Sequence, residues 1–146
     1  MSNFFYVLDK TVRLLFVDDD PILREFAQVN LASPSARIET AADGAEALER
    51  LAAADYDIVL LDLEMPVLDG FEASRRIRAI ELSEGWPPVA IIALTASAFA
   101  DDRARSLAAG MDEHMAKPLR SDQLAAVMQR LLPAAETGLE PTPAAG

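Results

Sequence analysis

An apolar run that ends in a carboxylate does most to limit how this chain can fold. The run Ile58 to Leu61 passes directly into Asp62, and the segment IVLLDLEMPVLDG continues through an acidic, proline-containing loop to Gly70. A run this short is typical of a strand that is buried on both faces. Asp62 then marks the carboxyl end of that strand, which is the edge where open α/β sheets bind ligands. Taken alone, the stretch is equally well explained as a strand end followed by a capped helix over 71–80.

The rest of the chain repeats this alternation of strand and helix. Strands are expected at 12–17, 37–41, 58–62, 89–94 and 113–117, and helices are expected after Pro21 and Gly44, at 71–80 and 101–110, and at 121–132. The helix after Pro21 is expected to carry Ile22, Phe26 and Val29 on one face. Five strands that alternate with five helices predict an α/β fold, with a doubly wound and mainly parallel sheet between helices on both faces.

Composition indicates one globular domain. The chain has 146 residues, of which 51% are hydrophobic, and this excludes a disordered chain. We expect a domain at 12–132, an N-terminal extension at 1–11 and a flexible tail at 133–146. A net charge of −11 argues against nucleic acid as a partner. Neither a signal peptide nor a membrane span is predicted, so a cytoplasmic location is expected.

Polar residues that lack a structural role follow the carboxyl ends of four strands. They are Asp18 and Asp19 after the first strand, Asp62 after the third, Thr95 after the fourth and Lys117 after the fifth. Because parallel strands end at the same edge of a sheet, we expect these side chains to converge.

The residue types at this edge indicate phosphoryl chemistry. Two carboxylates about 5 Å apart repel each other by roughly 3 kcal/mol at an effective dielectric constant of about 20, so three of them need a compensating cation. Oxygen ligands without cysteine or histidine nearby in sequence favour Mg²⁺. Lys117 supplies a positive charge and Thr95 a hydroxyl donor, which are groups that stabilise a transferring phosphoryl group. Asp62 is then the expected nucleophile, because a carboxylate can accept a phosphoryl group covalently.

Four segments occur in an order that is specific in combination: LFVDDDP, IVLLDLEMPVLDGFEA, IIALTA and AAGMDEHMAKP. Over residues 12–132 the chain resembles a response-regulator receiver domain, similar to the chemotaxis response regulator and to receivers of hybrid histidine kinases. The resemblance implies a flavodoxin-like (βα)5 fold and a cis peptide bond between Lys117 and Pro118. It assigns to the site the phosphoacceptor Asp62, the Mg²⁺ ligands Asp19, Asp62 and Glu64 (through its backbone carbonyl), Asp18 through water, and the phosphoryl-binding or switch residues Thr95, Ala96 (backbone), Lys117 and His114.

The resemblance also implies a conformational switch. Thr95 would be drawn toward a phosphoryl oxygen, and the residue at position 114 would enter the space it leaves. His114 stands where the family usually has tyrosine or phenylalanine, so switching is expected to weaken at low pH, when the imidazole is charged. The face formed by 101–110, 113–117 and 121–132 is the expected output surface, for a histidine kinase, a histidine phosphotransferase or a second copy of the chain.

The sequence therefore predicts a single-domain response regulator of a two-component or phosphorelay system, which accepts a phosphoryl group from a phosphohistidine onto Asp62 with Mg²⁺. Such a protein catalyses its own phosphorylation and slow dephosphorylation without being a conventional enzyme. One alternative is a receiver that binds partners without phosphorylation. A second is a phosphatase of the haloacid-dehalogenase type, although Glu64 stands where that family has its second aspartate. A nucleotide-binding flavodoxin-like domain is the third, although VDDDP is the electrostatic opposite of a phosphate-binding loop.

Overall fold

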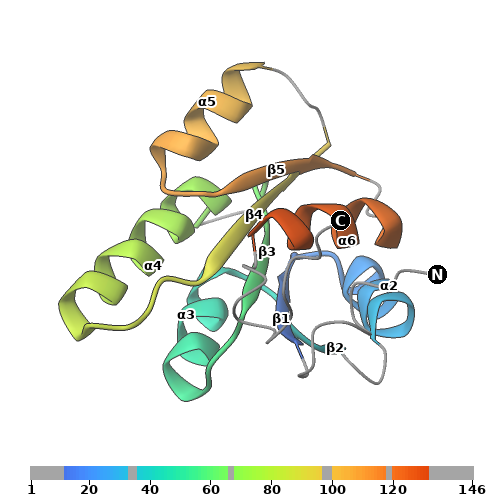
Figure 1. The fold of residues 1–146 in the computed structure, drawn as a ribbon, viewed down its shortest axis with the longest axis horizontal. Coiled ribbons are helices and arrows are strands. Elements are labelled where there is room, and N and C mark those ends of the chain that lie inside the picture. Colours follow the sequence, from blue (N-terminus) through green and yellow to red (C-terminus); the bar gives the residue numbers. More distant parts are fainter. Residues whose placement is uncertain (1–11, 33–35, 66–67, 97–99, 118–119, 132–146) are drawn as a thin grey trace, which may run out of the picture.

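Five parallel strands form one sheet at the centre of the domain (Figure 1). The computed structural model describes residues 12–32, 36–65, 68–96, 100–117 and 120–131. The strands are β1 (Val12–Val17), β2 (Ala36–Ala41), β3 (Ile58–Asp62), β4 (Ala90–Thr95) and β5 (Glu113–Ala116). Their order across the sheet is β2-β1-β3-β4-β5, so the topology reverses between β1 and β3. The predicted doubly wound parallel sheet is confirmed.

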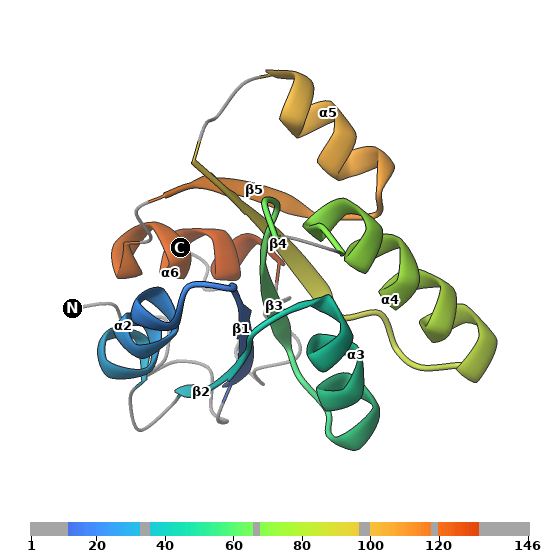
Figure 2. The same cartoon turned by 180° about the vertical axis from the view of Figure 1, so that it is seen from behind.

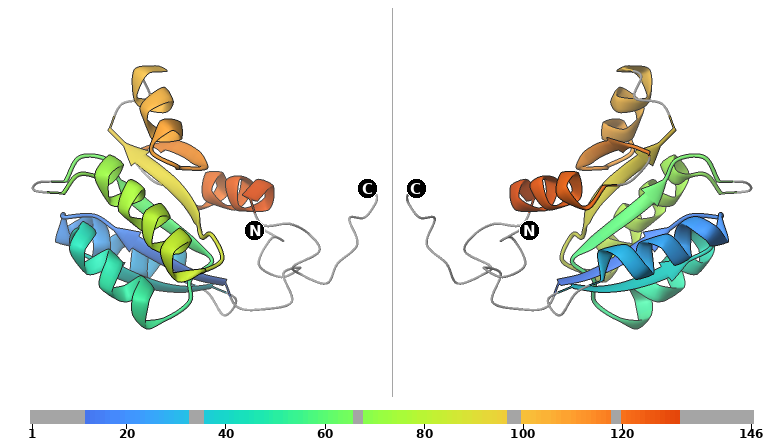
Figure 3. Two further views of the ribbon diagram at one scale, coloured as in Figure 1. Left: turned by 90° about the vertical axis from the view of Figure 1, so that its left-hand side faces the viewer. Right: turned by 90° about the vertical axis from the view of Figure 1, so that its right-hand side faces the viewer.

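Helices cover both faces of this sheet (Figures 1 and 2). The helices α2 (Pro21–Leu31) and α6 (Ser121–Leu131) lie on one face, and α3 (Gly44–Ala53) and α4 (Gly70–Glu84) lie on the other. The helix α5 (Ala100–Ala108) stands at the β5 end of the sheet, at the top of each view in Figure 3. None of the described helices is both long and apolar enough to cross a membrane.

Alternate residues of the central strand pack into two separate hydrophobic cores. Ile58 and Leu60 belong to the core beneath α2 and α6, whereas Val59 and Leu61 belong to the core beneath α3 and α4. All four side chains are fully buried, with 0% of their surface exposed. Because successive side chains of a strand point to opposite faces, this burial requires helices on both sides. The prediction of a strand buried on both faces is therefore confirmed.

Aspartates cap three of the described helices. Asp20 accepts a hydrogen bond from the Ile22 N–H at 2.9 Å, and Pro21 is the first residue of α2. Asp43 and Asp69 cap α3 and α4, and each accepts a hydrogen bond from the N–H three residues later. An N-cap carboxylate satisfies a backbone donor that would otherwise lack a partner, so these residues fix where each helix begins.

The helix α4 ends at Glu84 rather than at Ile80, where the apolar pattern stops. Glu81 explains the difference, because its carboxylate is only 6% exposed and accepts a hydrogen bond from the Val89 N–H at 2.7 Å. A buried carboxylate with partners on other segments is not visible in an apolar pattern. The helix is closed by Gly85, whose φ of 72° lies in the left-handed region.

The face of α2 that carries Ile22, Phe26 and Val29 points to solvent. These side chains are 74%, 45% and 71% exposed, respectively. The residues that α2 buries are Ala27 and Leu31, with Leu23 packed against the same core. The three residues share one face, as predicted, and this face is turned away from the sheet because Leu23, Ala27 and Leu31 occupy the inward positions.

Several expectations fall on residues that the structure does not describe. They are the extension at 1–11, the tail at 133–146 and the cis peptide bond between Lys117 and Pro118. Within the described residues, β5 is an edge strand and ends at Ala116, so Lys117 lies just beyond it.

Candidate functional site

The carboxyl ends of four strands bring the predicted site residues to one edge of the sheet. Asp18 follows β1, Asp62 ends β3, Thr95 ends β4 and Lys117 follows β5. The strands β1 and β3 are neighbours, so the first two of these residues meet where the topology of the sheet reverses. In doubly wound folds such a point leaves an opening for ligands outside the strand ends.

Three carboxylates form a cluster at this point. Asp18, Asp19 and Asp62 each offer an oxygen, and these oxygens lie within 4.8 Å of one another. Asp18 and Asp62 are each 1% exposed, whereas Asp19 is exposed. Two buried carboxylates at such distances repel each other strongly, and folding can keep them together only if positive charge is close by.

Lys117 supplies part of that charge. Its Nζ atom lies 3.2 Å from Asp18 Oδ2 and 3.2 Å from Asp62 Oδ1. Burial opposes the charged form of Lys117, but the two aspartates outweigh burial and raise the pKa of its ammonium group. One ammonium group between three carboxylates still leaves the cluster negative.

The carboxyl group of Asp62 is poised between its charged and neutral forms. Burial raises its pKa to about 6, the Glu64 N–H lowers it through a 3.1 Å hydrogen bond, the charge of Asp18 raises it and Lys117 lowers it. At neutral pH the carboxylate is therefore ionised, as a nucleophile has to be, at a free-energy cost that a cation would reduce.

The residues of this cluster fit a divalent cation. The Asp18 Oδ2 atom is buried and makes no hydrogen bond with the described residues, although Lys117 faces it as a counter-charge. Its partner Oδ1 accepts a hydrogen bond from the Asp20 N–H at 2.9 Å, and Arg24 holds the Asp18 carbonyl at 2.8 Å, so the loop has a fixed shape. A set of oxygen ligands with one buried and unsatisfied atom suits a hard ion such as Mg²⁺.

Thr95 lies beside Lys117 at the same edge. Its carbonyl accepts a hydrogen bond from the Lys117 N–H at 2.7 Å, and the residue is fully buried at 0% exposure. Ala96, the next residue, is exposed. This placement brings a hydroxyl group and an ammonium group to neighbouring strand ends, as the sequence predicted. The roles assigned to Thr95, to the Ala96 backbone and to the Glu64 carbonyl remain predictions.

His114 shares a face of the sheet with Thr95. It is paired with Ala93 in the register of β4 and β5, and Ala93 and Thr95 point to the same side because they are two residues apart. The Nε2 atom of His114 is buried and has no hydrogen bond from the described residues. His114 and Thr95 therefore share a face of the sheet on neighbouring strands, and the switch role of His114 remains a prediction.

The sequence profile of the response regulator receiver domain matches residues 14–129. The chain belongs to this family. It is therefore a receiver domain of the kind found in two-component signalling systems. The matched range includes every residue of the acidic cluster, and Lys117 and Thr95 as well.

Three relatives illustrate the range of this family. The response regulator MprA of Mycobacterium ulcerans is 39% identical over 84% of this chain and 50% of its own length. The receiver domain of sensor histidine kinase PA1611 from Pseudomonas aeruginosa, solved with a magnesium ion in its active-site cleft, has a TM-score of 0.71 and 38% identity over 83% of this chain and 97% of its own. The receiver domain of Ssk1 from Saccharomyces cerevisiae was solved with the histidine phosphotransfer protein Ypd1. It has a TM-score of 0.77 and 27% identity, over 84% of this chain and 89% of its own.

The chain spans only part of the curated proteins that it matches. It covers half of MprA and 7% to 13% of the sensor and hybrid histidine kinases. Receiver domains thus occur both beside other domains of response regulators and within kinases.

Gly70 is a site residue of this receiver that the sequence did not reveal. An added Cβ atom there would lie 2.4 Å from the carbonyl oxygen of Asp62 and 2.8 Å from Leu63 Cα. The Gly70 N–H donates a hydrogen bond to the Leu63 carbonyl at 3.2 Å, so the loop folds back onto the end of β3. The sequence explained Gly70 only as the residue after a capping aspartate.

Replacing Gly70 with alanine is therefore expected to lower the free energy of unfolding by about 3 kcal/mol, because the atoms that would clash belong to the backbone. Phosphorylation should also slow, since the Asp62 backbone has to move. Urea unfolding measures the first effect. A matched control is Gly85→Ala, where nothing lies within 4 Å and only the φ of 72° costs about 1 kcal/mol. Equal losses in the two variants would contradict the proposed close approach.

Replacing Asp19 with alanine is expected to abolish Mg²⁺ binding by this receiver while the domain stays folded. Loss of a residue that only hydrogen-bonds to a metal ligand typically weakens metal affinity about 10- to 100-fold. Loss of the ligand itself should weaken the affinity for Mg²⁺ by at least as much. Without Mg²⁺ the variant should be more stable than the natural chain, because one repelling carboxylate has gone. Calorimetric titration and urea unfolding in EDTA test both effects, with the exposed Asp122→Ala as control. Unchanged Mg²⁺ affinity would place the metal elsewhere.

Proposed function

We propose that this receiver accepts a phosphoryl group from a phosphohistidine onto the carboxylate of Asp62. The observation that carries the proposal is the position of this carboxylate, buried at the end of β3 between Asp18 and Lys117, with a pKa of about 6. In the transfer, the P–N bond of the phosphohistidine breaks and a P–O bond forms at Asp62. The electron pair of the broken bond stays on the imidazole nitrogen, which takes up a proton.

We assign distinct roles to the residues around this carboxylate. Asp19, Asp62 and the Glu64 carbonyl would hold Mg²⁺, with Asp18 binding it through water. The ion would supply positive charge to the carboxylates and to the phosphoryl oxygens. The ammonium group of Lys117, which lies 3.2 Å from both Asp18 and Asp62, would bind a phosphoryl oxygen on Asp62. The Thr95 hydroxyl and the Ala96 N–H would bind the remaining oxygens.

Transfer of label from a phosphorylated histidine phosphotransfer protein tests this function directly. The natural chain with Mg²⁺ should take up the label, and Asp62→Asn should take up none. The exposed Asp122→Asn serves as the matched control and should behave like the natural chain. If the natural chain takes up no label from phosphohistidine or acetyl phosphate, it is a binding module that acts without phosphorylation. Rapid release of free phosphate from small phosphate esters would instead favour a phosphatase.

The exposed apolar face of α2 supports a docking site for the phosphoryl donor. Ile22, Phe26 and Val29 lie on α2, which begins directly after the segment 18–20 that contains Asp18 and Asp19. Exposed apolar side chains that gather on one helix face are typical of surfaces that bind another helix. We propose that a helical histidine phosphotransfer protein, or the corresponding domain of a histidine kinase, binds there and brings its phosphohistidine to Asp62.

Changing Phe26 to serine should slow transfer from the phosphotransfer protein about 10-fold or more, because loss of an apolar anchor typically costs more than 1 kcal/mol of binding energy. Labelling by acetyl phosphate should be unchanged, since this small donor needs no docking surface. Leu82→Ser is a matched control, because Leu82 is 85% exposed on α4. If Phe26→Ser and Leu82→Ser slow transfer equally, the donor does not bind to this face of α2.

We propose that α5, β5 and α6 form the output face, to which a kinase, a phosphotransferase or a second copy of the chain binds. Thr95 follows Leu94, which is paired with Asp62 in the sheet, and His114 lies on the same side of the sheet as Thr95. Beryllofluoride with Mg²⁺ should therefore shift backbone amide signals of 100–117 and 121–131 as well as those near Asp62. Signals that change only around Asp62 would contradict the switch. We also propose that the protein is located in the cytoplasm, because a histidine kinase needs the ATP that is present there to supply the phosphoryl group. We propose no nucleic-acid partner, because the net charge of −11 would repel nucleic acid.

A further inference from the structure

A pocket of about 650 Å³ lies at the edge of the sheet opposite Asp62. It is formed by the end of α3, the segment that leads into β3, the end of α4 and the segment that leads into β4. Leu51, Tyr56, Trp86 and Val89 are among its mainly apolar lining residues. Its volume is in the range of pockets that enclose several side chains or a small ligand. The phosphoryl chemistry does not use it.

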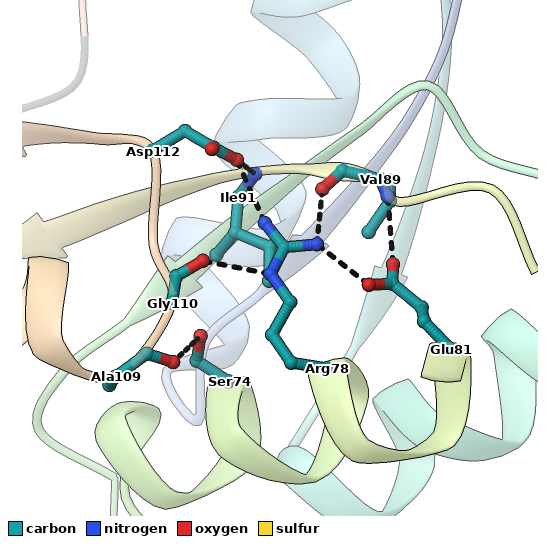
Figure 4. A network of polar contacts seen from close by, with 8 residues as sticks. All are labelled: Ser74, Arg78, Glu81, Val89, Ile91, Ala109, Gly110 and Asp112. Carbon is teal, nitrogen blue, oxygen red and sulfur yellow. Dashed lines mark hydrogen bonds and ion pairs between the residues drawn. The ribbon is translucent and has the colours of Figure 1, made fainter. Parts of the chain in front are cut away.

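One wall of this pocket is held in place by a polar network (Figure 4). Arg78 donates hydrogen bonds to the Val89 carbonyl at 2.7 Å and to Glu81 at 2.9 Å, and Glu81 accepts one from the Val89 N–H at 2.7 Å. Arg78 also binds Asp112 at 2.8 Å, which in turn accepts a hydrogen bond from the Ile91 N–H at 2.9 Å. Glu81 and Val89 both line the pocket, so it is preformed and does not depend on an occupant for its shape.

The amino end of β1 lies at the rim of this pocket. The Asp57 N–H donates a hydrogen bond to the Arg13 carbonyl at 2.8 Å, and the Arg13 N–H donates one to Asp57 Oδ2 at 2.9 Å. Asp57 itself lines the pocket. Val12, the first residue of β1 and the neighbour of Arg13, therefore lies close to the rim of the pocket.

We propose that the apolar stretch FFYVL, residues 4–8 of the same chain, occupies this pocket. The stretch offers three aromatic and two aliphatic side chains to a pocket whose apolar part includes Leu51, Ile77 and Trp86. The link from Leu8 to Val12 spans up to about 13 Å when extended, which is enough to cross a pocket of this volume.

This docking goes beyond the proposed phosphoryl transfer and leaves it unobstructed. The pocket is at the amino ends of the strands, whereas Asp62 and Lys117 are at the carboxyl ends. The occupied pocket would shield apolar side chains of the extension from water and tie the extension to the domain. Because the two sites are at opposite edges, failure of one proposal leaves the other standing.

The single tryptophan of the chain, Trp86, lines the pocket and reports on its occupant. In the full chain, Trp86 emission should be blue-shifted and protected from acrylamide quenching. The variant Phe4→Ser, Phe5→Ser, Tyr6→Ser should lose both the shift and the protection while its urea unfolding still shows a folded domain. A peptide of residues 1–11 added to this variant should restore them in a saturable way. Leu139→Ser, which alters the only large apolar side chain of 133–146, is the matched control and should change nothing.

Three results would overturn the proposal. The first is identical emission and quenching in the natural chain and the triple variant. The second is loss of protection in Leu139→Ser, which would make the segment 133–146 the occupant. The third is protection that disappears on dilution, because a segment supplied by a second copy depends on concentration whereas a segment of the same chain does not.

Discussion

Replacement of Lys117 by methionine is expected to destabilise the metal-free domain by about 2 kcal/mol and to abolish phosphoryl transfer. The Nζ atom of Lys117 lies 3.2 Å from both Asp18 and Asp62, so its removal leaves two buried carboxylates without their counter-charge. Breaking a buried ion pair by removing one partner costs a few kcal/mol, and the 23% exposure of the Lys117 side chain reduces that cost.

The destabilisation of Lys117→Met should depend on pH and on Mg²⁺. Lys117 lowers the pKa of Asp62, so the variant raises that pKa above its present value of about 6. The loss in the free energy of unfolding should be largest above the pKa of Asp62 in the variant, where Asp62 is charged. It should shrink as the pH falls and Asp62 takes up a proton. Added Mg²⁺ should restore most of the stability. Urea unfolding at several pH values measures these effects, with Arg120→Met, which removes an exposed ion pair with Asp122, as control. A pH-independent loss would contradict the account.

Replacement of Asp62 by asparagine is expected to stabilise the metal-free domain at neutral pH. The folded-state pKa of about 6 lies above the ordinary value of 3.8, so the ionised carboxylate destabilises the folded state. This cost is absent below about pH 4, grows as the pH rises through the folded-state pKa and is complete above it. The gain from asparagine should be on the order of 3 kcal/mol at pH 8 and should fall to about 0.5 kcal/mol at pH 4, close to the ordinary pKa of 3.8.

Urea unfolding of Asp62→Asn at pH 4, 6 and 8 in EDTA provides the measurement. Asp122→Asn is a suitable control because Asp122 is exposed. Arg120 lowers the pKa of Asp122, whereas the pKa of Asp62 is raised. A gain in stability that is the same at pH 4 and pH 8 would show that the charge of Asp62 is not its cause.

The strand ends could be predicted because a buried strand has a sharp signal in the sequence. An uninterrupted apolar run such as Ile58 to Leu61 requires cover on both faces, and this requirement implies a parallel sheet with crossover helices. Once the topology is parallel, the positions of Asp18, Asp62 and Lys117 at one edge follow without further information. The convergence of the site is thus a consequence of the fold class.

The features that could not be predicted depend on contacts between distant residues. Gly70 reads as a helix start, and only the folded chain shows that it packs against the backbone of Asp62. The apolar face of α2 looks like a buried face, because an apolar period alone does not tell which side meets the sheet. Glu81 reads as a solvent-exposed residue, whereas its partners Arg78 and Val89 bury it.

The most direct test of the central claim is to identify the residue that carries the phosphoryl group. After transfer from a phosphohistidine donor, sodium borohydride reduces an aspartyl phosphate to homoserine, which peptide mass mapping can locate. The account predicts homoserine at position 62 alone, in a reaction that requires Mg²⁺ and is absent in Asp62→Asn. Homoserine at Asp18 or Asp19, or labelling that persists in Asp62→Asn, would contradict it.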